Sequence, residues 1–183
     1  MILIFTGNGK GKTTAALGQA MRALGYGKKV MVIQFIKGPF ISGEHLFAEK
    51  LLITNYQLSI KRTGKGFVKI LGDKLPFKEH KKAAAEGLRM AKKAIKSKKY
   101  DVIILDEINN AVDLKLIKAG DVLKILHGIR NNAKIRKQFP DVILTGRNAP
   151  KSFIKIADIV TEMKEVKHVF QKNKHSAKKG VEY

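Results

Sequence analysis

A glycine-rich stretch near the start of the chain, TGNGKGKTT at residues 6–14, carries groups that suit phosphate binding. Its glycines can take positive φ angles and allow close backbone approach, so that successive N–H groups point at phosphate oxygens. Lys12 supplies a point charge for the phosphates, and the Thr13 hydroxyl is suited to bind Mg²⁺. The stretch follows an apolar run and opens a helical pattern, which is the setting of a phosphate-binding loop. The residues predicted to contact a nucleotide are Gly7, Asn8, Gly9, Lys10, Gly11, Lys12, Thr13 and Thr14.

The residue pattern of this stretch differs from that of the usual Walker A loop. Counting back from Gly11-Lys12-Thr13, the position that usually holds the first glycine is Thr6, and the first glycine comes one residue later at Gly7. The residues therefore predict phosphate chemistry on a loop of unusual form.

The stretch VIILDE at residues 102–107 is predicted to form the second half of the site. It is typical of a buried strand whose carboxylates emerge at its carboxyl end, where parallel α/β sheets bind ligands. Asp106 and Glu107 are both candidates for binding Mg²⁺, since an aspartate in this setting helps to hold the metal in ordinary P-loop enzymes. The glutamate could instead activate water, and Asp106 could instead cap a helix.

Three further residues carry weaker signals. Arg147 follows a fourth apolar run, so it can reach the same edge of the sheet and pair with phosphate, or form a surface ion pair. Arg22 is a structural residue by its position alone, and His168 alternates with apolar neighbours as a packed core histidine does. The sequence has no Ser-His-Asp set and no cluster of His and Cys. The chemistry must therefore come from the nucleotide, its metal and a second substrate.

Four short runs are almost continuously apolar, which is typical of strands buried on both faces of a parallel sheet. Patterns of helical period lie between and after them, and in one of these Ala84, Leu88, Ala91 and Ile95 form a single apolar stripe. Strands that alternate with helices predict an α/β fold with a mostly parallel sheet and helices on both faces. The expected strands are residues 2–5, 30–35, 102–105 and 142–145, and the expected helices are residues 13–24, 78–98, 119–127 and 150–157.

The composition sets broad limits on the protein. Its 183 residues suit one domain, 1–183, and 37 lysines and arginines against 15 aspartates and glutamates give a formal net charge of +22. Such a charge attracts anions in general and selects no partner. There is no cysteine and no apolar run long enough for a membrane span, so we expect a cytoplasmic protein without membrane contact. Residues 61–77 hold several glycines and little periodicity, which predicts either a mobile functional loop or a plain surface connection.

Several stretches, in order along the chain, resemble the ATP:corrinoid adenosyltransferases of the cobalamin pathway. Their order and specificity go beyond what a generic P-loop protein requires. They are TGNGKGKTTAALG (6–18), GKKVMVIQFIKG (27–38), VIILDE (102–107), ILTGR (143–147), IADIVTEM (156–163), VKHVF (166–170) and the closing GVEY.

The resemblance implies a RecA-like P-loop fold, a homodimer, and a reaction that is not hydrolysis. The 5′-deoxyadenosyl group of ATP would pass to the cobalt of a reduced corrinoid, cob(I)alamin or a precursor, with release of triphosphate, in adenosylcobalamin biosynthesis or salvage. The nucleotide would lie reversed in the loop, with its γ-phosphate near the usual place of an α-phosphate. Since Co(I) is itself the nucleophile, the missing protein nucleophile is then expected.

The resemblance also implies roles for single residues at the phosphate end. Thr13 and Glu107 would bind Mg²⁺ or Mn²⁺, which moves the metal from Asp106 to its neighbour. Arg22 and Arg147 would join the nucleotide-binding residues, and Lys12 would be catalytic.

At the corrinoid end, Phe67 in GKGFVK matches the aromatic residue that displaces the lower axial ligand, and would also be catalytic. Lys69 stands where well-known members have tryptophan, and Met1 directly precedes the first strand, so we expect no N-terminal extension over the corrinoid. A reductase or flavodoxin-like electron donor would reduce the cobalt.

Two other classes of protein remain as alternatives. A nucleic-acid-stimulated RecA-like ATPase would explain the charge of +22, although the lysines lack interleaved aromatic residues for base stacking, so nucleic acid is not the expected partner. A nucleotide-dependent regulatory module would bind ATP without consuming it.

Overall fold

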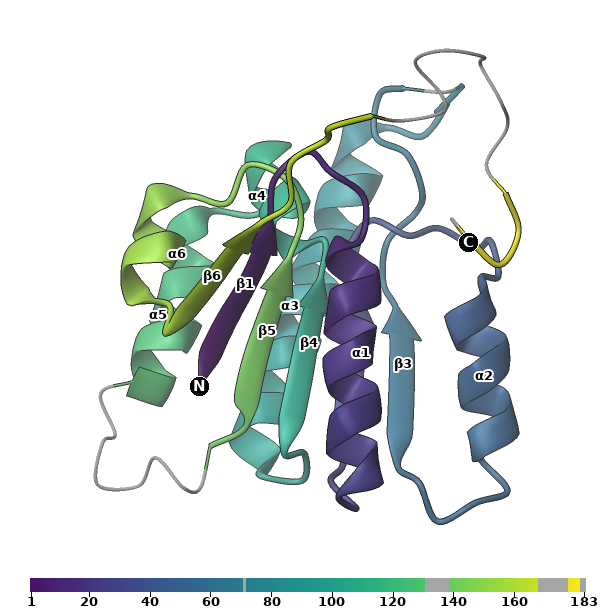
Figure 1. Cartoon of the computed structure of the whole chain (residues 1–183). Coiled ribbons are helices and arrows are strands. Elements are labelled where there is room, and N and C mark those ends of the chain that lie inside the picture. Colours follow the sequence, from purple (N-terminus) through teal and green to yellow (C-terminus); the bar gives the residue numbers. More distant parts are fainter. Residues whose placement is uncertain (71, 131–138, 168–177, 182–183) are drawn as a thin grey trace.

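The computed structural model of the protein describes residues 1–70, 72–130, 139–167 and 178–181. Within these residues six strands form one sheet in the order β3-β2-β4-β5-β1-β6, and neighbouring strands pair in parallel (Figure 1). The loops that follow the strands therefore gather at one edge of the sheet. The strands are β1 (Ile2–Thr6), β2 (Val30–Gln34), β3 (Leu58–Arg62), β4 (Val102–Asp106), β5 (Asp141–Thr145) and β6 (Ile159–Glu162).

Helices cover both faces of the sheet. One face carries α1 and α2, and the other carries α3, α4, α5 and α6 (Figure 1). None of the described helices is long and apolar enough to span a membrane. The helices are α1 (Lys12–Gly25), α2 (Gly43–Leu51), α3 (Phe77–Ser97), α4 (Ile108–Asp113), α5 (Ala119–Arg130) and α6 (Lys151–Ile156).

The sheet contributes side chains to two hydrophobic cores, because successive residues of a strand point to opposite faces. In β1, Ile2 and Ile4 pack in the core under α3, α5 and α6, whereas Leu3 and Phe5 pack in the core under α1. Burying one such side chain contributes about 1.5–3 kcal/mol. The central strands are therefore a firm base for the loops at their carboxyl ends.

The four strands and four helices predicted from the sequence are present, with ends that differ by up to three residues. The predicted stripe of α3 is buried, as Ala84, Leu88, Ala91 and Ile95 all join one core. The fold is the predicted α/β arrangement of a parallel sheet with helices on both faces.

Four elements were not predicted from the sequence: β3, β6, α2 and α4. Both strands lie at edges of the sheet; β6 is exposed along its whole length and β3 is only partly buried. Neither therefore needs the continuous apolar run that marks a central strand. The loop expected at residues 61–77 is shorter, since β3 ends at Arg62 and α3 begins at Phe77. His168 lies outside the described residues.

Candidate active site

The glycine-rich loop joins β1 to α1 at the carboxyl edge of the sheet. The helix begins at Lys12, and Gly11 before it has a φ of 111°, a conformation that glycine adopts at little cost. An α-helix leaves its first N–H groups without partners inside the helix, so this end of α1 suits phosphate oxygens. Of the three glycines in the loop, Gly7 and Gly11 adopt positive φ angles, whereas Gly9 does not.

The late first glycine has a structural reason. Thr6 is still part of β1, pairs with Glu162 of β6, and its carbonyl oxygen accepts a hydrogen bond of 2.8 Å from the backbone N–H of Met163. At Gly7, where φ is 95°, a side chain would place its Cβ 2.4 Å from the carbonyl oxygen of Met163. The N–H of Gly9 donates to that same oxygen at 2.7 Å. The chain therefore needs glycine at the point where it passes β6, one residue after the usual position.

Lys12 lies within the loop, and its Nζ donates to the carbonyl oxygen of Gly9 at 2.5 Å. Burial and the nearby positive charge of Arg147 lower the pKa of Lys12, and the carboxylates of Glu107 and Glu165 oppose them. The ammonium group thus lies where charges of both signs converge. An added anion, such as a phosphate, would favour its protonated form.

Asp106 ends β4 and is completely buried. Its Oδ1 accepts hydrogen bonds from the hydroxyls of Thr13, at 2.8 Å, and Thr145, at 2.7 Å, and its Oδ2 accepts one from Nε2 of Gln34 at 3.2 Å. These bonds connect the first turn of α1 to three neighbouring strands. Asp106 is therefore an acceptor that orients Thr13, and its side chain does not cap a helix.

Glu107 follows Asp106 in the left-handed region, with a φ of 61°, and its N–H donates to the Thr145 hydroxyl at 2.8 Å. Burial raises the pKa of Glu107 to about 7, with a further contribution from the Asp106 carboxylate, while Lys37, Lys12 and Arg147 oppose the rise. The two adjacent carboxyl groups thus have different partners, since Asp106 accepts from hydroxyl and amide groups whereas the nearby cations act on Glu107.

The oxygen donors here fit a hard divalent cation. Glu107 and Thr13 both line the cavity. The pKa of Glu107 is raised, and a nearby cation would favour the ionised form of this carboxyl group. Among the described residues there is no cluster of three or more His, Cys, Asp or Glu side chains. The pair of Thr13 and Glu107 matches Mg²⁺, which commonly takes one or two protein ligands and completes its shell with water and substrate phosphates.

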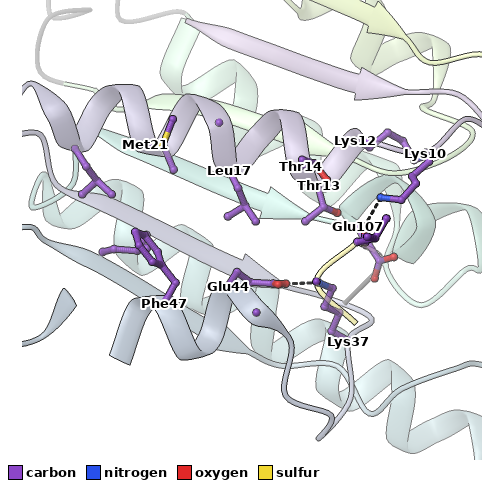
Figure 2. A pocket seen from close by; sticks show the side chains of 18 residues that line it. Lys10, Lys12, Thr13, Thr14, Leu17, Met21, Lys37, Glu44, Phe47 and Glu107 are labelled. Carbon is purple, nitrogen blue, oxygen red and sulfur yellow. Dashed lines mark hydrogen bonds and ion pairs between the residues drawn. The ribbon is translucent and has the colours of Figure 1, made fainter. Parts of the chain in front are cut away.

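A cavity of about 710 Å³ opens between α1 and α2, beside the glycine-rich loop. Figure 2 shows Lys12, Thr13 and Glu107 at one end, with Met21 of α1 and Phe47 of α2 toward the other end. The volume suits a nucleotide-sized ligand. Of the predicted site residues, those lining the cavity are Lys10, Gly11, Lys12, Thr13, Thr14 and Glu107, while Gly7, Asn8 and Gly9 belong to the adjoining loop.

Besides Asp106, which is buried behind Thr13, three predicted residues outside the glycine-rich loop do not line this cavity. Arg147 follows β5 and so lies at the same edge of the sheet, where its charge acts on both Lys12 and Glu107. Phe67 is 51% exposed and belongs to neither hydrophobic core. Arg22 lines a separate cavity of about 190 Å³ with Asp141, the first residue of β5, so the structure places it at the opposite edge from the loop.

Two charged residues of the cavity were not predicted from the sequence. Lys37 follows β2, Glu44 lies in the first turn of α2, and their side chains form an ion pair (Figure 2). The stretch GKKVMVIQFIKG contains Lys37, but composition alone does not separate this lysine from the many others in the chain.

A sequence model of the family described as ATP:corrinoid adenosyltransferase BtuR/CobO/CobP matches residues 1–183. The chain belongs to this family. The corrinoid adenosyltransferase of Escherichia coli strain K12 is 34% identical over 183 residues, which cover 100% of this chain and 85% of that protein. The corrinoid adenosyltransferase of Pseudomonas aeruginosa strain PAO1 is 35% identical over 184 residues, covering 100% and 83%. The resemblance inferred from the sequence is confirmed.

The fold of this adenosyltransferase is the predicted RecA-like P-loop fold. The flagellar accessory protein FlaH from Methanocaldococcus jannaschii matches with a TM-score of 0.52 and 14% identity, over 88% of this chain and 69% of that one. At this identity the likeness shows the fold alone, so the chemistry rests on the family and the site.

Proposed function

We propose that ATP binds in the cavity beside the glycine-rich loop and gives its 5′-deoxyadenosyl group to the cobalt of a reduced corrinoid. The observation that carries this proposal is that Lys12, Thr13 and Glu107 line one end of the cavity, in a chain of the corrinoid adenosyltransferase family. The described residues that line the cavity include no histidine and no cysteine. A reaction in which the second substrate is the nucleophile fits this lining.

The reaction balances without a protein nucleophile. The electron pair of Co(I) attacks C5′ of ATP, a Co–C bond forms, and the C5′–O bond breaks with both of its electrons leaving on triphosphate. The protein must hold C5′ in line with cobalt and stabilise the charge on the leaving group. The N–H groups at the start of α1 and the Lys12 ammonium are placed for the second task.

Thr13 and Glu107 are the proposed protein ligands of a Mg²⁺ ion bound together with ATP. The cation would supply positive charge beside the phosphates. Asp106, buried and bonded to Thr13, would orient the hydroxyl from behind. This division explains why two adjacent carboxylates differ so much in their surroundings.

Phe67 is the proposed contact with the lower face of the corrinoid. It is half exposed on a loop whose next residue, Val68, is buried in the core, so the aromatic ring is presented from an anchored backbone. An exposed aromatic ring is suited to cover a planar ligand. We also propose that the enzyme is a homodimer and that a reductase or flavodoxin-like protein supplies the electron that forms Co(I).

An ATP analogue with a non-hydrolysable β,γ-imido bridge tests this function directly. Adenosyl transfer breaks the C5′–O bond and leaves the β,γ bridge intact, so the analogue should still yield an adenosylated corrinoid from cob(I)alamin. An ATPase stimulated by DNA or RNA would instead be blocked by the analogue and would release ADP from ATP. If the analogue gives no adenosylated corrinoid while ATP is hydrolysed faster with nucleic acid, the proposal is wrong.

A further inference from the structure

Lys37 brings a positive charge to the phosphate end of the cavity from a segment outside the glycine-rich loop. It lies in the segment between β2 and α2, and it lines the cavity together with Lys12, Thr13 and Glu107 (Figure 2). Its positive charge acts on the Glu107 carboxyl group. Lys37 therefore faces the same space as the predicted phosphate ligands.

The ammonium of Lys37 is held by Glu44 of α2. The two side chains are 28% and 14% exposed, so the pair is partly shielded from water. Burial alone would raise the pKa of Glu44, but the hydrogen bond and charge of Lys37, aided by Ser42, outweigh it and lower the pKa to about 2. Glu44 is thus ionised at neutral pH, and its ion pair fixes the direction of Lys37.

Glu44 is in turn fixed by Gln34, the fully buried last residue of β2. The amide Nε2 of Gln34 donates to Glu44 and to Asp106, each at 3.2 Å. The N–H of Ser42 donates to Nδ1 of His45 at 3.0 Å, so Nε2 of His45 carries the proton and donates to Oε1 of Gln34 at 2.7 Å. Both polar atoms of the Gln34 side chain are therefore hydrogen-bonded. Through Gln34, the Lys37–Glu44 pair is linked to Asp106, the carboxylate that orients Thr13.

The backbone that carries Lys37 is also tightly packed. The N–H of Gly66 donates to the carbonyl oxygen of Ile36 at 2.9 Å, and a Cβ at Gly38 would lie 2.8 Å from backbone atoms of Gly66. The segments on either side of Lys37 thus rest against the loop that carries Phe67. Such contacts make Lys37 part of a built site and distinguish it from the exposed lysines of the surface.

We propose that Lys37 is a further triphosphate-binding residue, held in position by Glu44 through the Gln34–His45 network. This inference rests on the proposed function of the same cavity. An ammonium group has three donors, so Lys37 can keep its bond to Glu44 and still donate to a phosphate oxygen. As the C5′–O bond breaks and negative charge grows on triphosphate, Lys37 stabilises the leaving group from the side opposite the glycine-rich loop.

Binding of inorganic tripolyphosphate in the presence of Mg²⁺, measured by calorimetry on the full chain, tests Lys37 without requiring the reaction. Lys37→Met should weaken tripolyphosphate binding at least tenfold and lower kcat with pre-formed cob(I)alamin about a hundredfold. Lys50→Met is the matched control, because it removes the same charge as Lys37→Met. Lys50 is exposed in the last turn of α2 and lies outside the cavity. Lys37→Met with a tripolyphosphate Kd within twofold of the parent overturns the proposal.

The double variant Lys37→Met/Glu44→Gln guards against misfolding, since Lys37→Met alone leaves Glu44 as an unpaired, partly buried anion. The double variant removes both charges and should bind tripolyphosphate as poorly as Lys37→Met. Glu44→Gln alone should lower kcat about tenfold without weakening tripolyphosphate binding, because the cation remains but its direction is lost. If the kcat losses of the two single variants multiply in the double variant, Glu44 does not act through Lys37. Failure of the parent to adenosylate would sink the proposed function, whereas the tripolyphosphate Kd would still decide on Lys37.

Discussion

Replacing Glu107 with glutamine should stabilise the metal-free protein at neutral and alkaline pH. The pKa of Glu107 is raised from 4.5 to about 7, mainly by burial and then by Asp106. At about 1.4 kcal/mol for each pH unit, ionised Glu107 costs the folded state about 3 kcal/mol. Because this side chain is partly exposed to the cavity, that value is an upper limit.

The sign of the effect follows from proton binding. Between pH 4.5 and pH 7 the folded state holds the Glu107 proton and the unfolded state does not, so stability falls as the pH rises through this window. Below the window both states are protonated, and the carboxyl group makes no net difference. Glu107→Gln removes the titration, so its advantage over the parent should grow from near zero at pH 4 to at most about 3 kcal/mol at pH 8.

Urea unfolding of the two proteins in EDTA, at intervals from pH 4 to pH 8, measures this difference. Other titrating groups cancel when the two unfolding free energies are subtracted. Adding Mg²⁺ at pH 8 should stabilise the parent more than the variant and so reduce the difference. A difference that stays constant with pH, or that grows toward acid, would refute the electrostatic account of Glu107.

The remaining predictions concern the reaction. Lys12→Ala should lower kcat a few hundredfold, or about 3 to 4 kcal/mol, because it removes a preorganised charge from the leaving group; steady-state activity within twofold of the parent would contradict this role. Glu107→Gln should raise the Mg²⁺ concentration needed for activity more than Asp106→Asn does, whereas Asp106→Asn should cost about 1–3 kcal/mol of stability by disturbing a buried acceptor. The reverse ranking in a Mg²⁺ titration would return the metal to Asp106. Phe67→Ala should leave ATP binding and reaction with pre-formed cob(I)alamin almost unchanged, but should sharply slow adenosylation that starts from cob(II)alamin and a mild reductant. Equal losses from both starting materials would remove Phe67 from ligand displacement.

The sequence predicted the central strands well because burial on both faces leaves little choice of residue. β1, β2, β4 and β5 are buried almost throughout, and each shows as an apolar run. The edge strand β6 is exposed and β3 is only partly buried, so neither carries the continuous apolar run of a central strand. Their places in the sheet come from pairing with β2 and β1, which is tertiary information.

The site divides in the same way. The glycine-rich loop, Asp106 and Glu107 were predictable because each lies at, or directly after, the end of a central strand, and parallel strands bring their ends to one edge. Lys37 and Glu44 were not, since their pairing depends on how the segment after β2 and the first turn of α2 fold back over the cavity. The family resemblance likewise implied that Arg22 binds the nucleotide, although the length of α1 separates it from the loop.

The most direct test of the central claim is the product analysis of one anaerobic reaction. Purified protein is mixed with ATP, Mg²⁺ and chemically reduced cobalamin, and the corrinoid spectrum and the phosphate products are followed together. Adenosyl transfer predicts one triphosphate for each adenosylated corrinoid, with no matching release of ADP. Formation of ADP and phosphate without any adenosylated corrinoid would contradict it.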